Sequence, residues 1–123
     1  MGSTFDTVRD LARALPSVEE GGSANTPAFL VRGKLMAWFR GDPEVLAVKV
    51  SPINREYLLQ AEPDTFLLTE HYRDYPIVLV RLPRIGRRRL AEVLEEAWMQ
   101  VAPKRMRAEY ESARKLVTGK RAT

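Results

Sequence analysis

The sequence predicts a small α+β protein, with an antiparallel sheet of five strands flanked by helices. Its 123 residues suit a single domain, and 45% of them are hydrophobic, which is enough for one ordinary core. Segments with strand-like alternation occupy the middle of the chain, whereas helical spacing of apolar residues marks both ends. The expected order is α-β-β-β-α-β-β-α, with a further α-helix at the end, over one domain of residues 1–117.

The first expected element is a helix from about Thr4 to Leu15. Thr4 is a suitable N-cap, apolar residues recur at helical spacing, and Pro16 stops the helix. The segment Ser17 to Thr26 is rich in small and polar residues and lacks periodicity, so we expect a surface loop or a mobile flap.

Three strands are expected next, as an antiparallel meander. Phe29 to Val31 and Lys34 to Phe39 flank Arg32-Gly33, a spacing that fits a tight hairpin in which glycine supplies a positive φ. The third strand is Val45 to Val50, whose apolar residues alternate so that Lys49 should point away from the core.

A short helix and two further strands follow. Asn54 is a good N-cap for the helix, and Pro63 marks its end. The strands Thr65 to Thr69 and Ile77 to Leu82 are joined by the polar and aromatic connection Glu70 to Pro76. The second of these strands is apolar on both faces and should lie inside the sheet.

The most regular helical pattern runs from about Arg88 to Ala102 and is followed by Pro103. Its core-facing stripe consists of Leu90, Val93, Leu94, Ala97, Trp98 and Val101. A second amphipathic helix is expected from Met106, Tyr110, Ala113 and Val117. Residues 118–123 form a basic tail that we expect to be disordered.

Composition excludes several classes of protein. The chain has no cysteine, which removes disulfides and thiolate metal sites and suits a reducing compartment. Apolar runs are far shorter than the roughly 20 residues that span a bilayer, and the first residues do not resemble a signal peptide. We therefore expect a cytoplasmic protein that does not associate with membranes.

Residues for catalysis are scarce. His71 is the single histidine, and no serine lies in a nucleophile-elbow pattern. Glu20-Gly21-Gly22-Ser23 lacks the lysine and the spacing of a phosphate-binding loop. The adjacent pairs Glu19-Glu20 and Glu95-Glu96 would point apart on a helix. We expect no enzymatic activity, no cofactor and no metal.

Several phrases of the sequence resemble the MmcQ/YjbR family of small bacterial proteins. They cover most of residues 5–111 and are Phe5 to Pro16, Pro27 to Phe29 with Val31 to Lys34, Thr69 to Tyr72 with Pro76, Val78 to Leu82, and Ala97-Trp98 with Ala102 to Arg105. The resemblance implies a fold similar to that of secretion chaperones. It also implies DNA binding through two β-hairpin wings, which would be the turn around Arg32-Gly33-Lys34 and the connection Glu70 to Pro76.

The charge distribution is uneven. Residues 1–80 carry 8 basic and 11 acidic side chains, whereas residues 81–123 carry 12 basic and 5 acidic ones. Arg87, Arg88 and Arg89 lie where the long helix should start, and cations there oppose the helix dipole by about 0.3–1 kcal/mol each. A phosphate bound at that point would reverse this cost. Alternatively, the arginines pair with acidic residues of the 17–26 segment, or the helix begins later.

These observations predict a DNA-binding protein of little sequence preference. The candidate phosphate contacts are Arg32, Lys34, Lys49, Arg73, Arg87, Arg88, Arg89, Lys104 and Arg105. His71, Tyr72 and Tyr75 form a possible ligand-binding turn, although the tyrosines could instead shield the end of the sheet while His71 bonds a backbone carbonyl. The alternative function is a protein-interaction or small-ligand adaptor.

Overall fold

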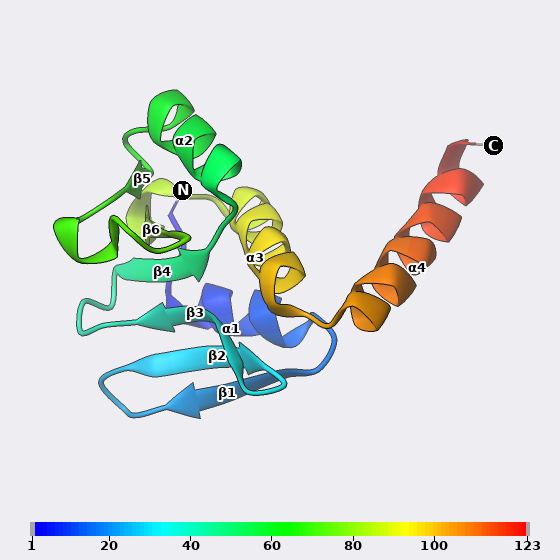
Figure 1. The fold of residues 1–123 in the computed structure, drawn as a ribbon, viewed down its shortest axis with the longest axis horizontal. Coiled ribbons are helices and arrows are strands. Elements are labelled where there is room, and N and C mark those ends of the chain that lie inside the picture. The colour runs from blue at the N-terminus through cyan, green and yellow to red at the C-terminus, as the bar shows by residue number, and fades with distance from the viewer. Residues whose placement is uncertain (1, 123) are drawn as a thin grey trace.

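The computed structural model describes residues 2–122, and the side chains of residues 2–115. It confirms the α+β class (Figure 1). In chain order the elements are α1 (Phe5–Arg13), β1 (Val18–Gly22), β2 (Pro27–Val31), β3 (Lys34–Phe39), β4 (Val45–Lys49), α2 (Pro52–Ala61), β5 (Phe66–Leu67), the 3₁₀ turn η1 (Glu70–Tyr72), β6 (Ile77–Arg81), the 3₁₀ turn η2 (Leu82–Arg84), α3 (Arg87–Val101) and α4 (Lys104–Ala122).

The strands form one antiparallel sheet in the order β1-β2-β3-β4-β6-β5. The meander expected for the first three predicted strands is confirmed, as β2, β3 and β4 are consecutive neighbours. Strand β6 lies between β4 and β5 with four of its five residues buried, so the expectation of an inner strand is also confirmed.

The sheet has six strands rather than the five predicted, because the segment expected to be a loop contains β1. This strand pairs with β2 from Val18 opposite Val31 to Gly22 opposite Pro27. Only Val18 in β1 is apolar, so the strand lacks the alternation that marks a half-buried strand. An edge strand can form on the hydrogen bonds of one neighbour, and sequence periodicity does not reveal it.

The hairpin between β2 and β3 turns at Arg32 and Gly33, as predicted. Both residues have positive φ, 51° and 82°, which is the conformation of a type I′ turn. A bulge follows, since the pairing shifts between Phe29 and Leu30 and leaves Met36 as an extra residue in β3. Met36 and Ala37 are both fully buried as a result.

The first face of the sheet, which carries Phe29, Leu46, Val48 and Val80, is covered by α1 and α3. The predicted stripe of α3 is buried at Leu90, Val93, Leu94, Ala97 and Trp98. Trp98 is fully buried, and its indole Nε1 donates a hydrogen bond of 2.9 Å to the carbonyl of Pro16. Helix α3 therefore fixes both the sheet and the end of the α1 segment.

The second face carries Trp38, Ala47 and Leu79 and has a smaller apolar cluster of its own. Tyr72, from the connection between β5 and β6, completes that cluster with Ile77. Lys49 lies on this face, opposite Ile77, and so points away from the main core as predicted.

Helix α2 begins differently from the prediction. Its N-cap is Ser51, whose Oγ accepts a hydrogen bond from the backbone N–H of Asn54, and Pro52 occupies the first helical turn. The side chain of Asn54, expected to be the cap, instead donates from Nδ2 to Oε1 of Glu96 on α3. Ser and Asn are comparable caps, and proline at the first position favours the earlier start.

Helix α4 departs from the body of the molecule after Pro103 and projects beyond it (Figure 1). Its first half is attached to α3. The ring of Tyr110 lies 4.8 Å from that of Trp98, and Glu95 accepts hydrogen bonds from Tyr110 Oη at 2.6 Å and from Arg114 Nη1 at 2.5 Å. The backbone is helical through Ala122, whereas Thr123 and the side chains from residue 116 lie outside the described part, so disorder of the tail 118–123 stays a prediction.

The attachment of α4 should be visible in the titration of Tyr110. Partial burial and the hydrogen bond to Glu95 raise the pKa of Tyr110 to about 12. Since the folded-state pKa is raised, the stabilisation is complete below the unfolded pKa of about 10 and is lost as the pH rises towards 12. We expect absorbance at 295 nm to show one tyrosine ionising near this pH, and Tyr110→Phe to remove that step.

Candidate nucleic-acid interface

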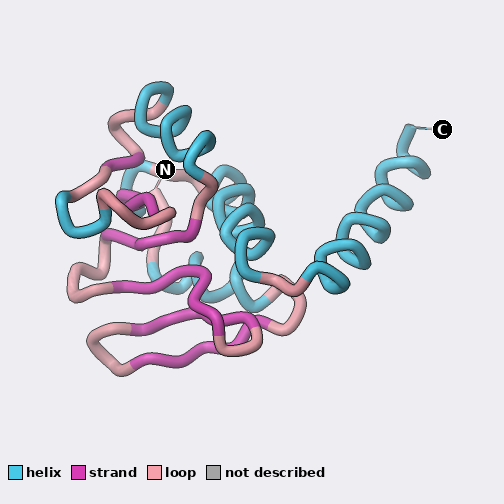
Figure 2. Tube along the Cα trace, in the orientation of Figure 1, coloured by secondary structure: helices cyan, strands magenta, loops and turns pink. Residues whose placement is uncertain are grey.

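The candidate cations fall at different ends of the sheet. The β2–β3 turn lies at the end where Val18 pairs with Val31 and where Lys49 pairs with Ile77. The other end holds the β1–β2 and β3–β4 turns, and there Val45 pairs with Arg81, the last residue of β6 (Figure 2). Because α3 starts shortly after Arg81, the structure does not bring Arg87, Arg88 and Arg89 together with Arg32 and Lys34.

The start of α4 lies towards the same end as the β2–β3 turn (Figure 2). The hydrogen bond from Trp98 to Pro16 and the stacking of Tyr110 on Trp98 hold the α3–α4 junction beside the segment that leads into β1. We call Arg32, Lys34, Lys104 and Arg105 the basic end. All four are exposed, and within the described residues the only ion pair among them joins Arg105 to Glu109 at 3.7 Å.

Lys49 has a different environment from the basic end. Its Nζ lies 5.9 Å from the centre of the Trp38 ring, on the second face of the sheet, and the residue is partly buried. This is a cation–π distance, so the ammonium group already has a partner within the protein.

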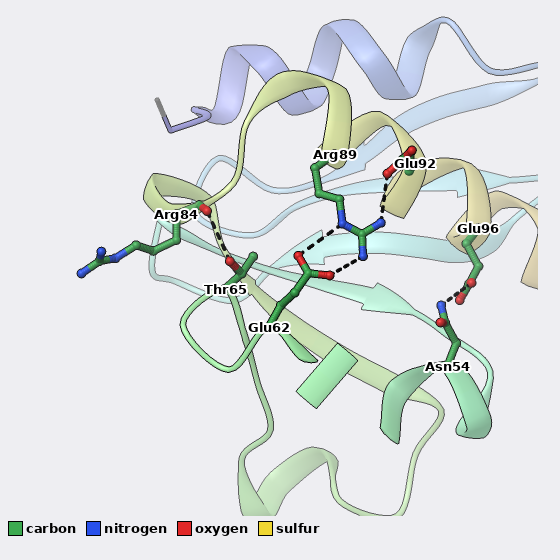
Figure 3. A network of polar contacts seen from close by, with 7 residues as sticks. All are labelled: Asn54, Glu62, Thr65, Arg84, Arg89, Glu92 and Glu96. Carbon is green, nitrogen blue, oxygen red and sulfur yellow. Dashed lines mark hydrogen bonds and ion pairs between the residues drawn. The ribbon is translucent and has the colours of Figure 1, made fainter. Parts of the chain in front are cut away.

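Arg89 is held by carboxylates of the protein itself (Figure 3). Its Nη2 and Nε bind the two oxygens of Glu62 at 2.6 and 3.3 Å, and its Nη1 binds Glu92 at 3.0 Å. The hydrogen bond to Glu62 raises the pKa of Arg89, and Glu92 adds to this effect. Glu62 is the C-cap of α2, so the end of one helix supplies the anion that the start of α3 lacks.

The other two arginines of this cluster are exposed. Arg87 Nη1 lies 4.0 Å from Oδ2 of Asp10 in α1, and this is a weak ion pair on the surface. Arg88 has no ion-pair partner among the described residues. The expectation of partners in the 17–26 segment is wrong, since the carboxylates come from α1, α2 and α3, and α3 begins at Arg87 rather than later.

The connection between β5 and β6 is not a projecting wing. His71 contacts the guanidinium of Arg40, just beyond β3, whereas the carbonyl of Pro76 accepts a hydrogen bond from Val50, just beyond β4. These two strands end at opposite ends of the sheet, so the connection crosses the second face. Tyr72 is 8% exposed, and its Oη accepts a hydrogen bond of 3.2 Å from Trp38 Nε1.

Arg55 of α2 holds this connection in place. Its guanidinium donates to the carbonyls of Arg73 at 3.2 Å, Tyr75 at 2.5 Å and Ile77 at 3.3 Å, with a longer contact of 3.5 Å to Tyr72. A fork of five N–H donors suits a turn whose carbonyls converge on one point. The connection is therefore packed structure, as expected if its aromatic residues shield the sheet.

The remaining residues of the possible ligand turn are on the surface. Tyr75 is 57% exposed, and Arg73 forms an exposed pair with Glu70 at 3.3 Å. His71 stacks edge-on against Tyr72 with 4.6 Å between ring centres, and its ring nitrogen meets Arg40 rather than the backbone carbonyl that was expected.

Over residues 2–122, three or more His, Cys, Asp or Glu side chains do not gather in any arrangement that could hold a metal ion. No helix in the same range is both long enough and apolar enough to cross a bilayer.

Sequence reasoning missed Arg55 and Glu62. Arg55 lies in a helix with several polar residues. Its partners are backbone carbonyls, which every residue has, so the sequence does not reveal them. The sequence does contain a signal for Glu62, because arginines at the start of a helix are unfavourable unless a carboxylate lies near them. Which carboxylate this is depends on how α2 packs against α3.

Comparisons with known proteins identify relatives of the chain. The YjbR family model matches residues 13–100. Uncharacterized proteins of Mycobacterium tuberculosis and Mycobacterium bovis are 32% identical over 122 aligned residues, which cover 85% of this chain and 92% of each relative. A crystal structure of a Deinococcus radiodurans protein with a DUF419 domain superposes with a TM-score of 0.72 at 27% identity, covering 87% of both chains.

The role of Arg89 can be tested against its neighbour. Arg89→Gln should destabilise the protein by about 1–3 kcal/mol, because Glu62 loses a two-point, charge-assisted partner. Arg88→Gln should change stability by less than about 0.5 kcal/mol, as expected for an exposed side chain. Urea unfolding followed by circular dichroism measures both, and equal effects would contradict the internal role of Arg89.

Arg55 should protect nearby backbone amides from hydrogen exchange. Arg55→Ala removes donors from at least three carbonyls, so we expect a loss of about 1–3 kcal/mol and faster hydrogen exchange at the amides of Tyr75 and Ile77. Arg73→Ala, which breaks only an exposed pair, is the matched control. Unchanged exchange at Tyr75 and Ile77 in the Arg55 variant would show that Arg55 does not hold the connection.

Proposed function

We propose, given that this chain belongs to the YjbR family, that it is a DNA-binding protein that uses its basic end, and that it is not an enzyme. The observation that supports this most is the placement of Arg32, Lys34, Lys104 and Arg105 at one end of the sheet. Three of these cations have no carboxylate partner among the described residues, and the fourth has only an exposed one within its own helix.

Free cations at one end of a domain suit a polyanion. Each one that meets a phosphate releases a condensed counterion, which gives affinity without reading the bases. The β2–β3 turn is tight and carries one cation, Arg32, with a second, Lys34, at the first position of β3, and the first turn of α4 adds two more. The proposed contacts are with phosphates, so little sequence preference is expected.

The proposed mode uses one hairpin and one helix start. The connection between β5 and β6 is held by hydrogen bonds from Arg55 and Trp38, and Arg89 is paired with Glu62, so neither is included. The cysteine-free sequence supports a reducing compartment, and we place the protein in the cytoplasm for that reason.

The salt dependence of binding tests this proposal. Fluorescence anisotropy with a labelled duplex should give a linear fall of log affinity with log salt, with a slope of about −0.9 for each phosphate contacted. In a variant with Arg32→Gln, Lys34→Gln and Lys104→Gln, we expect the slope to become shallower by about 2–3. Glutamine is used because it adds no new strain at the positive φ of Arg32.

The matched control removes the same charge from the other end of the sheet. Arg81→Gln, Arg84→Gln and Arg88→Gln change three exposed arginines and lower the net charge equally. The plot of log affinity against log salt for this control should keep most of the wild-type slope. The proposal fails if the wild-type protein does not bind duplex DNA at low salt, or if the two triple variants lose affinity equally.

A further inference from the structure

A hollow of about 710 Å³ lies at the end of the sheet opposite the basic end. It is open to solvent and is lined by the first half of α1, the β1–β2 turn and the β3–β4 turn. This volume is within the range of pockets that hold small molecules. Its lining includes Phe5, Arg9, Glu20, Gly22, Ser23 and Phe39.

The apolar part of this pocket is aromatic. The ring centres of Phe5 and Phe39 are 5.4 Å apart, and Phe29 lies behind Phe5 at 6.4 Å. Pro27 and Pro43 add flat apolar surface at the sides. A ligand that fits should present a flat apolar body, since aromatic faces favour stacked or edge-on rings.

The polar part is the pair of Arg9 and Glu20. Arg9 Nε and Nη2 donate to the two carboxylate oxygens at 2.9 and 2.8 Å, and Arg9 Cζ lies 4.6 Å from the centre of the Phe5 ring. This pairing raises the pKa of Arg9 and lowers the pKa of Glu20. Each oxygen of Glu20 thus accepts one hydrogen bond from Arg9, whereas none of the hydrogen bonds among the described residues uses Arg9 Nη1.

The wall formed by the β1–β2 turn is preformed. Ser23 and Thr26 exchange backbone hydrogen bonds of 3.3 and 3.2 Å, and their hydroxyl groups lie 2.7 Å apart. Gly22 has a φ of 80°, and a Cβ there would lie 2.1 Å from the carbonyl oxygen of Thr26. The turn needs glycine at this point, because any side chain would collide with the backbone of the turn itself.

We propose that this pocket binds a small aromatic carboxylate, with its ring against Phe5 and Phe39 and its carboxylate on the free Nη1 edge of Arg9. An anion is favoured over a cation because Arg9 is the more exposed member of the pair, with 39% of its side chain exposed against 28% for Glu20, and its Nη1 group carries unused N–H donors. The site is independent of DNA binding, since it lies at the opposite end of the sheet.

The probe for this proposal is 1-naphthoate, with the uncharged 1-naphthamide as its matched analogue. In a ¹H–¹⁵N NMR titration, naphthoate should shift the amide signals of Gly21, Gly22 and Ser23, and naphthamide should bind at least about tenfold more weakly. The loss of one charge-assisted hydrogen bond corresponds to about tenfold or more in affinity.

Variants separate the parts of the site. Arg9→Gln should weaken naphthoate binding about tenfold or more and naphthamide binding by a smaller factor, and Phe5→Leu should weaken both. Arg73→Gln, which removes the cation of an exposed pair outside the pocket, is the control and should change neither. Should Arg9→Gln fail to fold by circular dichroism, Arg9→Lys keeps the charge but lacks the fork, and it should bind naphthoate more weakly than wild type.

Three results would overturn the proposal. The first is an absence of naphthoate binding to the folded wild-type protein at millimolar concentration. The second is equal affinity for naphthoate and naphthamide. The third is a set of shifts that maps to the basic end instead of the β1–β2 turn.

Discussion

The packing of α3 against the first face of the sheet is the interaction on which the rest of the structure depends. Five residues of α3 are buried there, and truncating one of its leucines to alanine would cost about 2–5 kcal/mol. The same helix anchors three other parts of the chain. Trp98 bonds Pro16 and stacks on Tyr110, and Arg89 binds Glu62 at the end of α2. The positions of α1, α2 and α4 therefore all follow from one helix.

The inner strands impose a second constraint, because they are apolar on both faces. Helices α1 and α3 cover only the first face, so Trp38, Ala47 and Leu79 need a separate cover. The aromatic connection supplies it, and Arg55 holds this path in place by donating hydrogen bonds to the carbonyls of Arg73, Tyr75 and Ile77. An element that looks like a free hairpin loop in the sequence is used for packing and is not available as a wing.

The two ends of the sheet consequently have different properties. At the end with the α3 start, Arg89 is neutralised within the protein, whereas Arg81, Arg84 and Arg88 are exposed and form no ion pair among the described residues. At the other end, cations at the β2–β3 turn and the α4 start have few partners. The pocket beside Arg9 and Glu20 differs from both groups of exposed cations, because its two charges are paired with each other.

The sequence by itself determined the fold class, five of the six strands, the glycine turn at Arg32-Gly33 and the buried stripe of α3, since these depend on local periodicity and on backbone conformations that few residues adopt. Only the tertiary structure decided the existence of β1, the cap of α2, the path of residues 70–76 and the partners of each arginine. Edge pairing, carbonyl clusters and ion pairs join residues far apart in the chain, as in Arg89 with Glu62 or Arg55 with Tyr75. The sequence showed that the C-terminal third is basic, and the fold determined which of its cations remain free.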